Sequence, residues 1–127
     1  MALFKVFAAI SALFGGLSVA GGAFASHALK DRLSERMLEI FETGARYQMY
    51  HALALLAAAL WLAQGHGNAD WLTAAGWAFI VGILFFSGSL YSLSFTGVKA
   101  LGAIAPLGGA AFIAGWGCLV VAALTGK

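Results

Sequence analysis

Four long segments without charged residues divide the chain, at residues 6–26, 47–69, 71–98 and 100–126. Each is long enough to cross the hydrocarbon core of a bilayer, for which a helix needs about 20 mostly apolar residues. The pattern predicts membrane-spanning helices near residues 3–25, 47–63, 71–95 and 100–124. We therefore expect an all-α fold, an integral membrane four-helix bundle, that forms a single domain over residues 1–127.

Between the first two predicted spans, charged and apolar residues alternate with helical spacing. The apolar positions that fall close to one side of a helix are Leu29, Leu33, Met37, Ile40 and Phe41. This is typical of a short amphipathic helix that lies on a membrane surface or against its own bundle. We expect it at about residues 29–44, starting at Asp31 or Ser34 and ending or bending at Gly44.

The composition agrees with a membrane protein. Hydrophobic residues make up 62% of the chain and charged residues 9%, against about 25% charged in a soluble domain. The net charge is only +2 and no basic run is interleaved with aromatic residues, which indicates no nucleic-acid partner. Cys118 is the single cysteine, so no internal disulfide is possible.

The N-terminal segment also resembles a secretory signal peptide. Lys5 precedes an apolar run, and the sequence "AFAS" at residues 23–26 imitates a cleavage site. A signal peptide has an apolar region of about 7–15 residues, whereas this run has the length of a full span. We expect the segment to be retained as the first membrane helix.

The distribution of Lys and Arg predicts the orientation. Four spans place the first and third loops on one side, where five basic residues lie: Lys30, Arg32, Arg36, Arg46 and Lys99. The other side has only Lys5 and Lys127, and its hairpin at residues 64–70 has none. By the positive-inside rule, loops one and three are cytoplasmic and both termini lie outside.

Small residues are frequent in the predicted spans, where they let helix backbones approach closely. Candidate packing positions are Gly15, Gly16 and Gly22 in the first span and Gly108 and Gly109 in the fourth. Pro106 lies in the same segment of the fourth span. Because proline has no amide hydrogen, we expect it to free a carbonyl in the preceding turn and to kink the helix.

The second span begins with polar residues. At 100° per residue, Glu42, Arg46, Tyr47, Tyr50 and His51 fan over about half of the helix circumference, and Gln48 lies outside the fan. Glu42 and Arg46 have the favourable order for an ion pair. The stripe fits two interpretations: a snorkelling arginine with an interfacial tyrosine belt, or a polar cluster inside the bundle, where burial of ionisable groups is costly and indicates function.

Polar side chains of the other spans fall in the same leaflet as this stripe. His27 closes the first span, and Ser87, Tyr91 and Ser94 follow one line along the third. The topology brings these residues to the end of the second span, so we group them with it as a candidate polar cluster. Serines in helices more often bond to their own backbone carbonyls, which is the competing interpretation.

Four segments resemble the YgdD-like family of small inner-membrane proteins, a family of unknown function. They are "GGAFASHAL" (residues 21–29), "FETGARYQMYHALALL" (41–56), "FFSGSLYSLSFTG" (85–97) and "IAPLGG" (104–109). The chain departs from the pattern at Ala105, where threonine is more frequent, and at Ser26, where glycine or alanine is. The resemblance implies a four-span protein of the bacterial inner membrane and implies no activity.

The residues favour a protein that is not an enzyme. His27, Glu42 and His51 are a conceivable metal set, but no recognised metal or nucleophile motif is present, so we expect no metal and no cofactor. Our first hypothesis is a non-catalytic protein that packs against lipids, a second copy or a membrane-protein partner. The alternative is a transporter or channel subunit for a small solute or protons, using Glu42, Arg46 and His51.

Overall fold

The structure, a computed structural model, describes residues 1–126. Every regular element in that range is helical, which confirms the all-α class. The α-helices are α1 (Leu3–His27), α2 (Glu35–Gln64), α3 (Ala69–Gly82), α4 (Gly88–Thr96) and α5 (Ala105–Thr125). Two 3₁₀ turns, η1 (Leu29–Asp31) and η3 (Lys99–Ala103), and one π-helical turn, η2 (Ile83–Ser87), complete the order.

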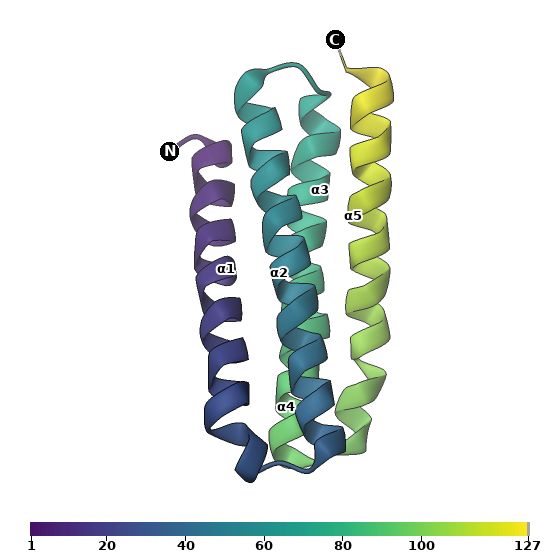
Figure 1. The fold of residues 1–127 in the computed structure, drawn as a ribbon. Helices are drawn as coiled ribbons and strands as arrows, with labels where there is room; N and C mark the ends of the chain where they lie inside the picture. Colours follow the sequence, from purple (N-terminus) through teal and green to yellow (C-terminus); the bar gives the residue numbers. More distant parts are fainter. Residues whose placement is uncertain (127) are drawn as a thin grey trace.

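The helices lie side by side as four rods, because α3, η2 and α4 form one continuous rod (Figure 1). α1 packs mainly on α2, α5 packs mainly on α3, and α2 also contacts α3 and α4. The start of α1 and the end of α5 lie at the end of the bundle that holds the α2–α3 connection. The opposite end holds η1 and η3, and we call it the charged end because Lys30, Arg32, Arg36 and Lys99 lie there.

Three segments of the structure are long and apolar enough to cross a membrane: Leu3–His27, Ala69–Thr96 and Lys99–Thr125. They correspond to the first, third and fourth predicted spans. The second predicted span, residues 47–63, lies inside α2 and does not meet the same standard of composition. The reason is that Tyr47, Gln48, Tyr50 and His51 dilute its apolar residues. Length and composition therefore support three spans and not four.

The expectation of a separate amphipathic helix at residues 29–44 is wrong. Ser34 does cap a helix, since its hydroxyl accepts a hydrogen bond from the Met37 amide (3.1 Å). However, α2 then continues without a break through Gly44 to Gln64. A Cβ at Gly44 would come within 3.0 Å of the Tyr91 ring. The glycine thus permits close approach of α4 instead of ending the helix.

The expected kink at Pro106 is also absent. η3 covers Lys99–Ala103, and α5 begins only at Ala105, so the proline lies in the first turn of the helix. An amide hydrogen has no partner within the helix at that position, so its loss costs nothing there. Pro106 therefore marks the start of α5, and the fourth predicted span is a 3₁₀ turn followed by a helix.

Aromatic rings packed on glycines form much of the core. A Cβ at Gly76 would collide with the ring of Phe7, and one at Gly82 would collide with the ring of Phe112. Gly115 receives Phe79 in the same way. Phe7 and Phe79 are fully buried, so the glycines act as sockets that let neighbouring helices close around large side chains.

The glycines expected to mediate packing behave differently from one another. A Cβ at Gly108 would collide with the backbone of Phe86, so α5 and η2 approach closely there. A Cβ at Gly15, Gly16, Gly22 or Gly109 would meet nothing within 4 Å. Those four glycines do not mediate close contacts within this chain.

Candidate functional site

Gln48 of α2 joins α1 and α4. Its side chain is 5% exposed, and its Nε2 donates to the backbone carbonyl of Phe14 in α1 (2.8 Å). Its Oε1 accepts from the hydroxyl of Tyr91 in α4 (2.7 Å). Because a carbonyl can only accept, these partners fix which end of the amide faces which helix.

His51, almost one turn further along α2, joins α2 to α5. Its Nε2 lies 3.1 Å from Nε1 of Trp116, and its Nδ1 lies 2.7 Å from the Tyr47 carbonyl. An indole nitrogen only donates, so Nε2 must be the acceptor and Nδ1 must carry the hydrogen that bonds to Tyr47. The imidazole is therefore neutral. It also stacks on Phe112, with ring centroids 3.5 Å apart and an interplanar angle of 7°.

Two serines bond to neighbouring carbonyls of α2. The Ser18 hydroxyl of α1 donates to the Ala45 carbonyl (2.6 Å), and the Ser87 hydroxyl of η2 donates to the Gly44 carbonyl (2.7 Å). Both serines are buried. Hydroxyls from two different helices thus converge on adjacent residues of α2, where Gly44 and Ala45 leave room for them.

We call these side chains the polar layer: Ser18, Gln48, His51, Ser87, Tyr91 and Trp116. Each of them makes a hydrogen bond between helices, and α2 is a partner in every one. Within residues 1–126, no buried side-chain nitrogen or oxygen lacks a hydrogen-bond partner. In a site shielded from water, such mutual satisfaction removes most of the cost of burying polar groups.

Sequence reasoning found only part of the polar layer. His51, Ser87 and Tyr91 were among the candidates, whereas Gln48, Ser18 and Trp116 were not. The signal for Gln48 was present: it continues the helical spacing of Gly44 and Ala45, and this small-residue face of α2 is the buried one. The polar stripe centred on Arg46 left Gln48 out, although Gln48 lies on the buried face of α2.

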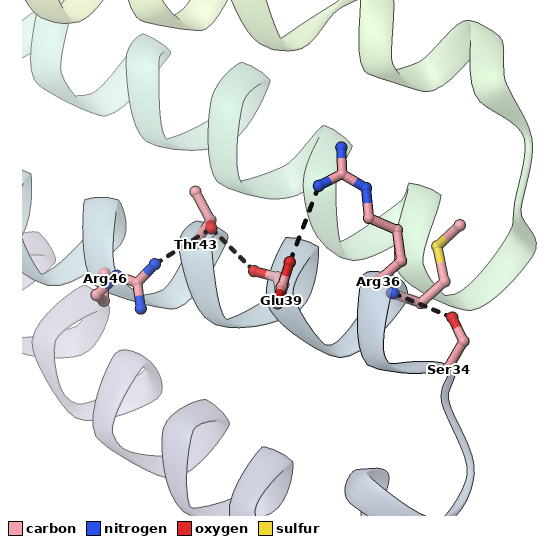
Figure 2. Close-up of polar contacts among 6 residues, drawn as sticks. Ser34, Arg36, Glu39, Thr43 and Arg46 are labelled. Carbon is pink, nitrogen blue, oxygen red and sulfur yellow. Dashed lines mark hydrogen bonds and ion pairs between the residues drawn. The ribbon is translucent and has the colours of Figure 1, made fainter.

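Of the two charged residues of the expected stripe, Glu42 is half-buried and Arg46 lies on the exposed side of α2 (Figure 2). Arg46 is exposed and donates to the Thr43 hydroxyl (3.3 Å), which in turn donates to the Glu39 carbonyl (2.8 Å). The expected Glu42–Arg46 ion pair is not formed. Within residues 1–126 the one ion pair joins Arg36 and Glu39, at 3.9 Å between largely exposed side chains.

The remaining candidates are not brought into one cluster. Tyr47 and Tyr50 are 39% and 52% exposed and contact each other edge to face, with centroids 5.5 Å apart. His27 is exposed in the last turn of α1, and the Ser94 hydroxyl bonds to the Tyr91 carbonyl of its own helix. Among residues 1–126, no three His, Cys, Asp or Glu side chains are placed to hold a metal ion.

An apolar groove of about 540 Å³ lies between α2 and α5. We call this hollow the α2–α5 groove. His51 and Trp116 meet at one of its ends. Its lining is Tyr47, His51, Phe86, Pro106, Gly109, Ala110, Phe112, Ile113 and Trp116. Ile113 is 76% exposed and Trp116 48%, so the groove opens sideways on the surface that a bilayer would cover.

These features define the class of the protein: a helical transmembrane protein with apolar outer faces and hydrogen bonds between its helices. Comparison of the chain with known proteins gives the same class and also the family. The chain belongs to the family described as "Protein of unknown function (DUF423)", whose model matches residues 21–109, and its relatives are called UPF0382 membrane proteins.

The relatives match almost the whole chain. A UPF0382 membrane protein of Staphylococcus epidermidis is 48% identical over 120 residues, which cover 94% of this chain and 96% of the relative. The UPF0382 membrane protein YwdK of Bacillus subtilis is 46% identical over 120 residues, covering 94% and 97%. No solved structure matches the chain. The YgdD-like label itself stays an expectation.

Proposed function

We propose that this chain is a non-catalytic, four-span protein of the bacterial inner (plasma) membrane that binds lipids or a membrane partner through its lateral surface. The observation that carries the proposal is the contrast between interior and surface. The polar side chains inside the bundle are hydrogen-bonded to one another or to backbone carbonyls of neighbouring helices, whereas the hollow open to the surrounding membrane is apolar.

The order of the helices supports a fourth span. α1 ends at the charged end of the bundle, and α3 begins at the opposite end (Figure 1). If α1 and the α3–α4 rod both cross the bilayer, then α2 must cross it as well to connect them. Its polar side chains do not oppose this, because Gln48 and His51 face protein instead of lipid, and polar residues are tolerated in a span under that condition.

Thiol labelling tests the span and the orientation together. In a Cys118→Ser background, one variant carries Lys30→Cys and a second carries His66→Cys, both at exposed positions. A membrane-impermeant maleimide added to intact cells should label residue 66 and should reach residue 30 only after permeabilisation. Labelling of both residues from the same side would exclude a crossing by α2, and the reverse pattern would place the charged end outside.

The contacts of His51 favour a structural role over a path for solutes or protons. Both of its ring nitrogens are bonded to protein groups, while Arg46 lies on the exposed face of α2 with Thr43 as its partner. A transport path needs groups that exchange partners with a moving solute. The transport hypothesis therefore has no observation of its own to support it.

Crosslinking in native membranes tests the binding role. Photoreactive side chains at Ile113 and Leu13, two exposed apolar positions on different helices, should yield defined adducts with a lipid, a second copy or another membrane protein. A photoreactive side chain at the buried Leu55 is the control that should yield none. If neither exposed position gave a defined adduct, the proposed role would be wrong.

A further inference from the structure

We propose that the α2–α5 groove holds one acyl chain of a phospholipid whose phosphate is bound by Arg36 at the charged end. The inference rests on the proposed membrane location and names a ligand class for the lateral surface. It depends on four features of the groove: its length, its closed end, its apolar lining and the charged hollow beside it.

The groove has the length of one leaflet. On α5 its lining extends from Pro106 to Trp116, which at 1.5 Å per residue is about 15 Å. This is half of a hydrocarbon core about 30 Å thick. An acyl chain of one leaflet fits that length, whereas a helix of a partner protein would need contact across the full thickness.

The end of the groove at mid-bundle is closed. Trp116 of α5 and His51 of α2 are joined by a 3.1 Å hydrogen bond across it, and the lining does not extend beyond these two residues. Phe112 stacks on His51 and forms part of the floor. A flexible chain that enters from the charged end would stop here, near the middle of the bilayer.

Apart from the hydroxyl of the partly exposed Tyr47, the lining presents no side-chain polar group that a hydrocarbon chain would leave unsatisfied. The polar atoms of His51 are already bonded to Trp116 and Tyr47. The remaining wall consists mostly of Phe86, Ala110, Ile113 and Gly109. Because lipid tails are as apolar as this wall, the chain would gain van der Waals contacts instead of hydrophobic transfer energy.

A charged hollow adjoins the groove at Phe86. This second hollow, of about 330 Å³, shares Phe86 with the groove and adds Arg36, Glu39, Ile40, Thr43 and Leu90. The Arg36 side chain extends from α2 on the side away from α1 (Figure 2) and is 77% exposed, with a single long contact to Glu39. Its guanidinium donors are free to form the paired hydrogen bonds with a phosphate that arginine favours.

The groove can be filled without disturbing the fold. A Cβ at Gly109 would meet nothing within 4 Å, so Gly109→Leu places a side chain in the groove without a backbone clash. Gly117 lies on the same helix outside the lining, and a Cβ there also meets nothing within 4 Å. Gly117→Leu is therefore a matched control that enlarges the lipid-facing surface elsewhere.

The test uses the full chain in vesicles of phosphatidylglycerol and phosphatidylcholine that contain traces of each lipid with a diazirine near the end of one acyl chain. After illumination, mass spectrometry locates the adducts. We expect them to concentrate at Phe112 and Ile113. In the Gly109→Leu variant the yield of these adducts should fall about threefold or more, because van der Waals packing is a modest driving force in hydrocarbon. The Gly117→Leu variant should leave the yield unchanged.

The phosphate site has its own pair of variants. Arg36→Gln should lower labelling in the groove with either headgroup, since both lipids carry a phosphate diester, whereas Arg32→Gln, an exposed change outside the hollow, should not. Equal labelling of all exposed faces, unaffected by Gly109→Leu, would show ordinary lipid contact and overturn the inference. Crosslinks between two chains at Ile113 would overturn it in favour of a second copy.

The two tests distinguish an error in the acyl-chain site from an error in the proposed binding role. If the groove retained no lipid while Leu13 still captured a defined partner, only the acyl-chain site would be wrong. If no exposed position captured anything, the binding role would fail as well.

Discussion

The hydroxyl of Tyr91 on α4 donates a 2.7 Å hydrogen bond to the side-chain oxygen of Gln48 on α2. The same Gln48 donates from its nitrogen to the Phe14 carbonyl of α1. One amide thus connects three helices. Gln48 is 5% exposed, so water has little access to replace either partner.

Gln48→Leu should destabilise the protein. The substitution nearly preserves volume but leaves the Tyr91 hydroxyl without its partner and removes the bond to Phe14. Hydrogen bonds between membrane helices contribute about 0.6 kcal/mol on average, so we expect a loss of about 1 kcal/mol in the free energy of unfolding. Equilibrium unfolding of the variant and the unsubstituted protein in bicelles measures this difference in the free energy of unfolding. In a cycle with Tyr91→Phe the two effects should not add, and strict additivity would refute the coupling.

Two serines on α1 form a matched pair. Ser18 donates to the Ala45 carbonyl of α2, whereas Ser26 donates to the Gly22 carbonyl of its own helix. Ser18→Ala should lower the free energy of unfolding by about 0.5–1.5 kcal/mol, and Ser26→Ala should change it little. Equal effects of both variants would mean that the bond between helices adds nothing beyond the ordinary bond within a helix.

Gly108 and Gly109 of α5 should differ sharply in how well they tolerate substitution by alanine. A Cβ at Gly108 would collide with the backbone of Phe86, which cannot move aside as a side chain can, whereas a Cβ at Gly109 meets nothing within 4 Å. Gly108→Ala should cost about 1–3 kcal/mol of stability through forced separation of α5 and η2, and Gly109→Ala should be close to neutral. Thermal unfolding in detergent compares the two. A tolerated Gly108→Ala would contradict the close approach.

The tautomer of His51 can be observed directly. Its contacts require hydrogen on Nδ1, bonded to the Tyr47 carbonyl, and a bare Nε2 that accepts from Trp116. Nitrogen-15 NMR of the imidazole in nanodiscs should therefore show a neutral ring with Nδ1 protonated. His51→Phe would keep the stacking on Phe112 but should release the Trp116 indole hydrogen, visible as a shift of its resonance. A ring protonated on Nε2 would rule out the arrangement.

Structural features that depend on a single helix or segment were predictable from the sequence. Ser34, one of the two helix starts expected after the first span, caps α2, and Gly65 ends this helix in a left-handed conformation (φ 75°) before the short connection to α3. The three apolar spans lie where the uncharged segments indicated. Caps, turns and transfer into lipid are local properties, because each depends on nearby backbone groups or on the composition of a single segment.

What the sequence determined by itself is an apolar helical chain whose charges gather mostly at one end and whose segments suit a bilayer. Only the tertiary structure decided that Gln48 bonds to Phe14 and Tyr91, that Gly108 and not Gly109 lies against Phe86, and that α2 runs unbroken through Gly44. The physical reason is that contacts between helices depend on which faces meet. Periodicity places a residue on a face of its own helix, but the partner of that face is set by how all the helices pack together.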